Sequence, residues 1–405
     1  MTSRRLYLFD DGRARRWAPF SLTRPIGELT FGCLTLRARA ERTFGVKCEG
    51  HITRTALVGF DEAGSAPAVT LEHVRPDAVT ILLSSRAVPD LAPAAVPDTL
   101  TRITIGGATA GWVIPAGGSP PSDLWLRDPS TAPVEGETLA LGGHLLAHPW
   151  NLVAANSQRI ASDIGSLWDV GDTPDGAIII GDNGVSLGDG AVVEPGVVLD
   201  TRGGPIRLQQ GVRVEGPARL VGPLFVGEHT TVLGGTMGRS SIGAHCKVRG
   251  EVSESVISNF VNKAHDGHIG HAMVGSWVNL GAGTINSDLK NNYGTVKVWT
   301  PDGDVDTRLV KIGCFLGDHV KTGIGTLLNT GTVVGAGSNV FGGLMPPVAV
   351  PPFSWGSGSE LTTFRLEKFM EVTERAMARR GVALSAGVRG VLERAWASTA
   401  SQRPE

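Results

Sequence analysis

The chain has 405 residues, enough for two or three domains, and a formal net charge of −2. Without an excess of basic residues, nothing in the charge favours binding to nucleic acid or to an acidic membrane surface. The four cysteines are scattered and include no CxxC pair, so neither a zinc cluster nor a disulfide framework is indicated. Such cysteine usage is typical of a reducing cytoplasm.

The N-terminus has no targeting pattern. Only a short apolar run, Leu6 to Phe9, precedes the acidic pair Asp10 and Asp11, which is too short for a signal peptide. No run approaches the ~18 apolar residues of a membrane span. We therefore expect a soluble, cytoplasmic protein with no nucleic-acid and no membrane partner.

Residues 1–165 predict an α/β domain. Apolar runs at residues 6–9 and 79–83 predict strands, and residues 26–44 have partly helix-like spacing. The Pro- and Ala-rich stretch at 87–97 predicts a loop. Residues 150–167 predict a helix, with Leu152, Val153, Ile160 and Ile164 on one side.

From about residue 176 apolar residues recur every six positions. This period fits neither an amphipathic helix nor a plain strand; it fits a triangular solenoid in which each flat side takes one hexapeptide. We therefore predict a left-handed parallel β-helix over residues 176–352, in preference to a β-sandwich with coincidental spacing. The period is seen in three registers, namely Leu187, Val193, Leu199; Leu208, Val214, Leu220, Val226, Val232; and Leu328, Val334, Val340.

Two segments depart from the period. Residues 286–306 are polar at their start and predict a loop that leaves the solenoid, a place where function often resides. After a proline cluster, residues 360–405 predict a helical tail that covers the open end of the solenoid or joins subunits. A triangular solenoid usually buries one flat face around a threefold axis, so a homotrimer is expected.

Residues 263–275, followed by the string Asn279-Leu280-Gly281-Ala282-Gly283-Thr284-Ile285, resemble the acetyltransferase domain of bifunctional N-acetylglucosamine-1-phosphate uridylyltransferase/glucosamine-1-phosphate acetyltransferases. The resemblance implies that His265, fourteen residues before Asn279, is the general base. It implies acetyl-CoA as co-substrate and Asn279 as a polar contact of the substrate or of that histidine. An imidazole titrates near neutrality, so it can take a proton from the attacking amine. The alternative for His265 is a solvated corner histidine, the role expected for His245, His271 and His319.

The chain departs from that family around the sugar. His268 stands where the family has a tyrosine, and residues 286–294 differ from the family's Cys-Asn-Tyr-Asp-Gly, so the amine acceptor stays open. His268, Asp288 and Lys290 are the candidates for substrate binding, and Lys290 or Lys297 could instead be solvated loop lysines. For the acetyl-CoA arm, which the family binds along the solenoid edge near residues 317–326, the candidates are Gly281, Ala282, Lys321 and Thr322.

The N-terminal half resembles the N-terminal domain of sugar nucleotidyltransferases fused to such β-helices. The residues that carry the resemblance are Leu8 to Asp11, Phe20 to Leu29, Gly32 to Leu36 and Trp150 to Asn156. The usual Gly-rich phosphate loop is missing, so Arg13, Arg16 and Arg24 would have to supply charge to a triphosphate. Asp10 and Asp11 are the candidate ligands of Mg²⁺, which prefers carboxylate oxygens. The alternative is a strand-end acid pair among solvated loop arginines.

These observations together predict a transferase of UDP-N-acetylglucosamine-type sugar-nucleotide biosynthesis. The N-terminal domain would join a sugar 1-phosphate to an NTP (UTP or dTTP) with Mg²⁺, and the β-helix would acetylate an amino sugar phosphate. Two other hypotheses stay open: an enzyme that retains only one of the two activities, and a non-catalytic regulatory or scaffold protein.

Overall fold

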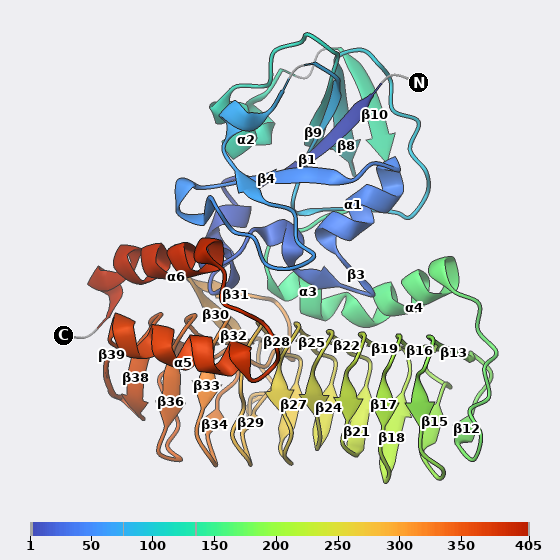
Figure 1. Cartoon of the computed structure of the whole chain (residues 1–405), viewed down its shortest axis with the longest axis vertical. Helices are drawn as coiled ribbons and strands as arrows, with labels where there is room; N and C mark the ends of the chain where they lie inside the picture. Colours follow the sequence, from blue (N-terminus) through green and yellow to red (C-terminus); the bar gives the residue numbers. More distant parts are fainter. Residues whose placement is uncertain (1–2, 76, 134–135, 404–405) are drawn as a thin grey trace.

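The computed structural model describes residues 3–75, 77–133 and 136–403. An N-terminal α/β domain stands on one side of a long parallel β-helix, and the C-terminal helices lie against both (Figure 1). The predicted fold class, an α/β domain followed by a left-handed parallel β-helix, is confirmed. Within the described residues no helix is long and apolar enough to cross a membrane.

The N-terminal domain is built on a seven-stranded sheet with the order β10-β8-β9-β6-β1-β4-β5. The strands predicted at residues 6–9 and 79–83 are confirmed as β1 and β6, which pair in parallel with each other. β4 pairs in parallel with β1 on its other side, so the carboxyl ends of all three strands meet at one edge of the sheet. The strands are β1 (Arg4–Phe9), β4 (Cys48–Ile52), β5 (Ala68–Val69), β6 (Val79–Ser84), β8 (Thr101–Ile105), β9 (Ala108–Ile114) and β10 (Glu137–Leu141).

The helix-like spacing at 26–44 yields one α-helix only in its last part, α1 (Leu36–Phe44). The Thr35 hydroxyl accepts a hydrogen bond from the Ala38 N–H at the start of α1, and Gly45 ends it at φ 64°. Before it, Gly32 at φ 67° turns the chain between two short strands, β2 (Thr30–Phe31) and β3 (Leu34–Thr35), which interrupts the helical pattern.

Two further expectations are corrected in detail. The helix expected at 150–167 is broken at Ala155 into α3 (Trp150–Ala154) and α4 (Asn156–Leu167). The loop expected at 87–97 begins with a strand, β7 (Ala87–Pro89), because its backbone pairs antiparallel with β11 (Gly143–Leu145). The remaining α-helix among the described residues of the domain is α2 (Asp123–Arg127).

The β-helix has three faces, each a ladder of parallel strands. The first face holds β12 (Ile178–Ile180), β15 (Val198–Asp200), β18 (Ala218–Val221), β21 (Gly235–Gly238), β24 (Glu251–Ser253) and β27 (His268–Gly270). The second face holds β13 (Val185–Leu187), β16 (Ile206–Leu208), β19 (Leu224–Val226), β22 (Ser241–Ile242), β25 (Val256–Ile257), β28 (Met273–Val274), β32 (Phe315–Leu316), β35 (Val333–Val334) and β37 (Ala349–Val350). The third face holds β14 (Val192–Val193), β17 (Arg213–Val214), β20 (Thr231–Val232), β23 (Lys247–Val248) and β26 (Asn262–Lys263), and farther along β33 (Lys321–Thr322), β36 (Asn339–Phe341) and β38 (Ser354–Ser357). At its end β39 (Glu360–Thr363) pairs antiparallel with β38.

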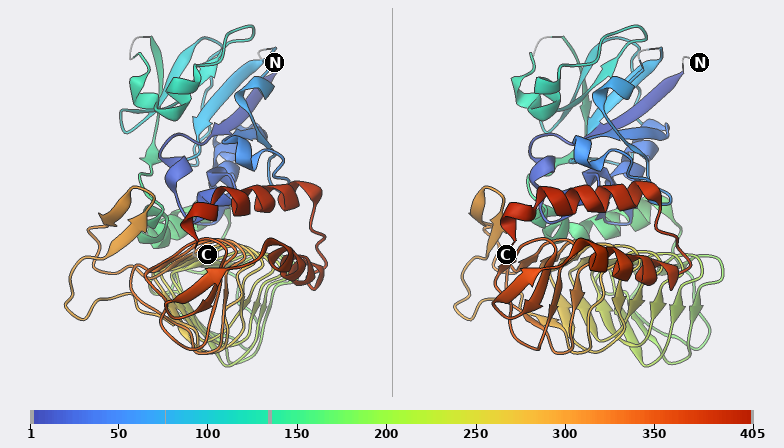
Figure 2. Two further views of the ribbon diagram at one scale, coloured as in Figure 1. Left: turned by 90° about the vertical axis from the view of Figure 1, so that its left-hand side faces the viewer. Right: turned by 60° about the vertical axis from the view of Figure 1, so that its left-hand side comes forward.

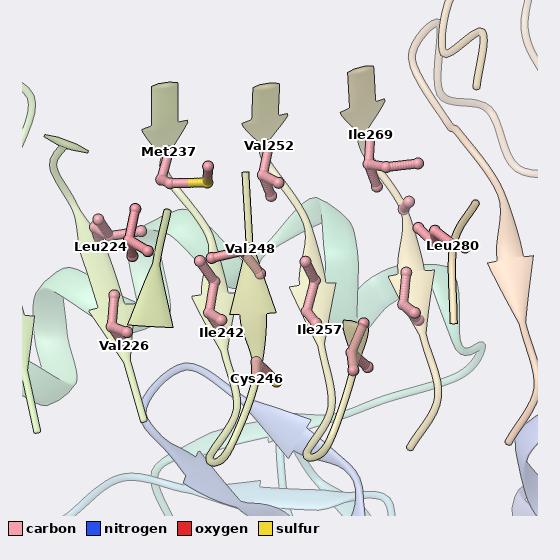
Figure 3. Packing of buried hydrophobic residues seen from close by; sticks show 14 of the residues in the cluster. Leu224, Val226, Met237, Ile242, Cys246, Val248, Val252, Ile257, Ile269 and Leu280 are labelled. Carbon is pink, nitrogen blue, oxygen red and sulfur yellow. The ribbon is translucent and has the colours of Figure 1, made fainter. Parts of the chain in front are cut away.

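The interior is filled by the aliphatic residues that the six-residue period predicted. Val193, Leu199, Leu208, Val214, Leu220, Val226, Val232, Leu328, Val334 and Val340 are all members of one buried cluster, and Leu187 packs against it. Figure 3 shows the same stacking for neighbouring coils, with Val226, Ile242 and Ile257 side by side in one row. Each inward side chain is buried against its copies in the next coils, which stabilises the solenoid.

The non-periodic segment leaves the solenoid as expected and folds into a hairpin, β30 (Lys297–Thr300) and β31 (Gly303–Asp306). It lies between β29 (Ile285–Asn286), which pairs with β34 (Leu327–Leu328), and β32. Figure 2 shows the hairpin rising beside the N-terminal domain. Near its tip Asp302 makes an ion pair of 2.8 Å with Arg16 of that domain.

The tail forms α5 (Leu366–Ala378) and α6 (Ala386–Ser398). α5 lies along the β-helix, and α6 lies between the β-helix and the N-terminal domain (Figures 1 and 2). Phe369 and Met370 of α5 and Leu392 of α6 share a buried cluster with Phe353, near the end of the solenoid.

The two domains share one buried core. Outward side chains of the second face, among them Met273, Phe315 and Val333, pack with Trp17, Phe20 and Trp150 of the N-terminal domain. The second face is therefore covered by the α/β domain, and the third is partly covered by α5, whereas no described helix lies over the first face (Figure 1).

Candidate functional site

The acids that follow β1 are both buried. The two Asp10 carboxylate oxygens accept hydrogen bonds from the Thr53 hydroxyl at 2.6 Å and from the Ser85 hydroxyl at 2.5 Å. Thr53 follows β4 and Ser85 follows β6, so the convergence of the parallel strands brings these groups together. Asp10 thereby connects three strand ends.

Asp11 is held by Arg86 in a bidentate arrangement. The Arg86 Nε lies 2.8 Å from Asp11 Oδ1, and Nη2 lies 2.7 Å from Oδ2. The same carboxylate accepts hydrogen bonds from the backbone N–H groups of Arg13 and Ala14 and from the Ser84 hydroxyl. Arg86 also donates to the Leu146 carbonyl.

All four oxygens of Asp10 and Asp11 are therefore occupied by protein donors. Within the described residues there is no group of three or more His, Cys, Asp or Glu side chains that could hold a metal ion. These side chains do not fit a metal site made by the protein alone, although Mg²⁺ is often bound by one or two carboxylates together with substrate phosphates.

A cavity of about 610 Å³ opens beside Asp11, and we call it the arginine pocket. It is lined by four arginines, Arg13, Arg16, Arg86 and Arg127, from separate parts of the N-terminal domain. Trp299 and Asp302 of the β30–β31 hairpin form part of its wall, so both domains contribute. On another wall His148 stacks on Trp150, with ring centroids 4.2 Å apart. Guanidinium groups around a cavity with aromatic walls suit a phosphorylated ligand that carries a flat ring.

Arg24 lies elsewhere, buried at the junction of the two domains. Its Nε donates to Asp318 of the β-helix at 2.8 Å, and its Nη1 donates to Glu62 at 2.8 Å. Burial lowers the pKa of Arg24, but Asp318 and Glu62 outweigh this effect and hold that pKa above its ordinary value. Arg24 was expected to face a triphosphate, and the structure corrects this expectation. Both partners of its guanidinium group are acidic side chains, and Arg24 does not line the arginine pocket. Arg13 and Arg16, named with it, do line that pocket.

His265 lies in the exposed turn that follows β26. Its carbonyl accepts a hydrogen bond of 2.8 Å from the Lys263 Nζ, and no described side chain is bonded to its ring. Asn279 lies on the third face, where its backbone bridges Asn262 and Lys321. The Asn262 Nδ2 donates to Asn279 Oδ1 at 2.8 Å. The structure therefore gives no contact between the side chains of His265 and Asn279 within one chain.

The side chains around His268 form a cluster on the first face. His271 Nδ1 lies 2.7 Å from Asp288 Oδ2, His268 Nε2 lies 3.9 Å from the same oxygen, and His268 Nδ1 lies 3.2 Å from Glu251. Asp288 raises the pKa of His268, while the two histidines hold the pKa of Asp288 below its usual range. Gly270 makes this approach possible, because a Cβ there would lie 2.4 Å from His268 Nε2.

His271 was expected to be a solvated corner histidine, and the structure corrects this expectation. It occupies a corner at φ 47°, but its ring is bound to Asp288, a predicted substrate contact. The sequence signal for this cluster was the His-Ile-Gly-His string, in which one histidine precedes and one follows a glycine. His319 is likewise no solvated residue, because it is only 5% exposed and burial lowers its pKa to about 3.

The other predicted contacts do not share one surface. Lys290 is held by its own loop, with Nζ donating to the Thr295 carbonyl at 2.6 Å. Lys321 points outward from the third face, and burial lowers its pKa to about 8. Thr322 points inward and hydrogen-bonds the Thr284 hydroxyl at 2.7 Å. The backbone N–H of Gly281 donates to Thr322, and the carbonyl of Ala282 accepts from Gly325.

Comparison with known proteins finds a family similar to the N-terminal part. Residues 6–169 match the family described as sugar nucleotidyl transferase. The bifunctional sugar-1-phosphate nucleotidylyltransferase/acetyltransferase of Sulfurisphaera tokodaii is 33% identical over 93 residues, which cover 23% of this chain and 23% of that protein. The bifunctional protein GlmU of a Nostoc species is 27% identical over 177 residues, which cover 38% of this chain and 35% of that protein. The matched regions thus span only about a quarter to a third of the length of these relatives.

Among solved structures, the UDP-N-acetylglucosamine acyltransferase of Arabidopsis covers 56% of this chain and 92% of its own, with 13% identity and a TM-score of 0.31. In sequence, residues 6–169 are similar to the sugar nucleotidyl transferase family, and part of the chain is similar to bifunctional nucleotidyltransferase/acetyltransferases, as its motifs predicted.

Proposed function

We propose that this chain is a two-domain transferase of sugar-nucleotide biosynthesis whose N-terminal domain joins a sugar 1-phosphate to an NTP. The observation that carries the proposal is the arginine pocket, which lies at the carboxyl ends of β1 and β6 inside the segment that matches the sugar nucleotidyl transferase family. In open α/β sheets ligands bind at this edge.

The reaction follows from the charges there. An oxygen of the sugar 1-phosphate attacks the α-phosphorus of the NTP, a new P–O bond forms, and the bond to the β-phosphate breaks to release pyrophosphate. Arg13, Arg16 and Arg127 supply positive charge to the phosphates without a Gly-rich loop. Arg86 is fixed by Asp11, so it presents a rigid guanidinium edge to the pocket.

The test is an assay of pyrophosphate release by the purified full-length protein with a panel of sugar 1-phosphates, UTP and dTTP, with and without Mg²⁺. Arg13→Ala and Arg127→Ala should each raise the KM for the NTP about tenfold, since a charge-assisted contact contributes ~1.5–3 kcal/mol. The matched control is Arg375→Ala, an exposed arginine of α5 far from the pocket. If no NTP yields pyrophosphate, the domain does not catalyse nucleotidyl transfer.

For the β-helix we propose acetyl transfer from acetyl-CoA to an amino sugar phosphate, with His265 as general base. The supporting observation is that His265 is exposed and its ring has no protein partner among the described residues, so it can accept a proton. The attacking amine forms the amide bond, the thioester C–S bond breaks, and the amine proton passes to the imidazole.

Release of free thiol from acetyl-CoA measures this second activity.

His268, His271 and Asp288 lie on the first face, the one that no described helix covers. We propose that this face joins three chains in a homotrimer that completes the site. Light scattering tests the assembly, because a monomer at the assay concentration contradicts it.

A further inference from the structure

A second cavity, of about 440 Å³, lies between the third face of the β-helix and the end of α5. Lys247 and Lys321 line it from the β-helix, and Arg379 and Arg380 line it from α5. Two amides, those of Asn262 and Asn279, lie between the lysines. We call this cavity the basic pocket.

The periodicity of the solenoid builds one wall of the basic pocket. Lys247 pairs with Asn262, Asn262 with Asn279, and Asn279 with Lys321, so each successive coil adds one outward polar side chain to the same column. Neighbouring parallel strands are about 4.8 Å apart, which makes the column a continuous strip of donors. Beside it the rings of Phe260 and Trp277 stack at 4.1 Å and form a flat apolar wall.

The charge of the basic pocket is unbalanced. It has four cationic side chains and no acidic residue in its lining, and none of the four makes an ion pair with a described residue. The Arg380 Nη2 is buried without a hydrogen-bond partner. Burial of Lys321 without a nearby carboxylate lowers its pKa to about 8, consistent with a cation that lacks its counter-ion. Like charges gathered in one partly buried site are costly unless an anion joins them.

The amides add direction to this charge. Because the Asn262 Nδ2 donates to Asn279 Oδ1, the Asn279 amide nitrogen is left without a described acceptor. A tetrahedral oxyanion such as phosphate offers several acceptor oxygens to amide donors of this kind. Lysine and arginine, the other side chains of the pocket, are the usual residues that bind phosphate.

We propose that the basic pocket binds the phosphate or diphosphate group of a small molecule, at a site separate from the arginine pocket. The stacked Phe260 and Trp277 rings leave room beside the anion for a flat or apolar part of the same ligand. Two sources share this chemistry, a free nucleotide and the phosphates of coenzyme A. Binding of coenzyme A would extend the acetyl transfer proposed for the β-helix, and only this assignment of the ligand rests on the proposed function.

Isothermal titration of the full-length protein with pyrophosphate, UDP, coenzyme A and dephospho-coenzyme A tests the site without requiring turnover. Arg380→Gln and Lys247→Gln should each weaken binding of the preferred probe about tenfold or more, as expected for a charge-assisted contact. Lys368→Gln, an exposed lysine on α5 outside the pocket, is the control and should bind as the wild type does. Arg13→Ala distinguishes binding in the arginine pocket from binding in the basic pocket. This variant should leave binding in the basic pocket unchanged.

The four probes distinguish the ligand. Preference for coenzyme A over its dephospho form assigns the pocket to the cofactor, and preference for UDP or pyrophosphate assigns it to a free nucleotide or its product. The unfolding temperature of each glutamine variant should not fall, because the removed cations have no protein partner. Equal affinity of the wild type, Arg380→Gln and Lys247→Gln for every probe, or no binding of any probe to the wild type, overturns the proposal. Both outcomes are independent of whether the protein releases pyrophosphate from an NTP.

Discussion

Arg24 offers the sharpest contrast between the expected and the observed role of a residue. Arg24→Met keeps the length and apolar packing of the side chain but leaves Asp318 and Glu62 without their shared cation. Loss of one partner of a buried ion pair costs about 3–5 kcal/mol. With an unfolding entropy of about 2.1 cal/mol/K per residue, a chain of 405 residues loses about 4–6 °C of Tm if it unfolds as one unit.

Differential scanning calorimetry measures this shift. The control is Arg16→Met, which removes an ion pair with Asp302 whose members are both more than half exposed and should change the Tm by less than about 1 °C. Asp318→Asn added to Arg24→Met should restore part of the loss, because it removes the unpaired buried charge. An unchanged Tm together with a raised KM for the NTP would refute the structural role and return Arg24 to the triphosphate.

Three further outcomes are expected. His265→Ala should lower the kcat of acetyl transfer by about 10²–10⁴-fold with an unchanged Tm, and full activity of this variant contradicts the expectation. His271→Ala should lower the activity too, because the His271 ring holds Asp288. Since the pKa of His319 is lowered to about 3 in the fold, the unfolded chain gains a proton first as the pH falls below about 6.5. Stability should therefore decline by up to about 1.4 kcal/mol per pH unit below that value, and His319→Phe should flatten this part of the denaturation profile. In the basic pocket, where Lys321 faces Lys247, Arg379 and Arg380, the affinity for pyrophosphate should fall between pH 7 and pH 9 as Lys321 loses its charge, and calorimetric titration at both pH values checks this.

Local patterns in the sequence determined the larger part of the fold. The six-residue period alone specified the β-helix, because every inward position must be aliphatic for the coils to stack, and Val226, Val232 and Val334 lie in the core as predicted. The apolar runs of β1 and β6 likewise needed no tertiary information. An element whose form depends on a distant partner was different: β7 exists because β11 pairs with it. The helical pattern of residues 26–44 failed for a local reason, since the Gly32 turn between β2 and β3 interrupts it.

The sites depended far more on tertiary structure. Motif spacing led to His265 and Asn279, but it could not show that Asn279 points towards α5, since that contact joins residues about a hundred positions apart in the chain. Nor could it show that Arg24 pairs with Asp318, 294 positions away. The arginine pocket and the basic pocket are formed by side chains whose separations in sequence carry no periodic signal. A sequence pattern reports what a residue does within its own element, whereas the electrostatic surroundings of a charged group are decided by whichever elements the fold packs against it.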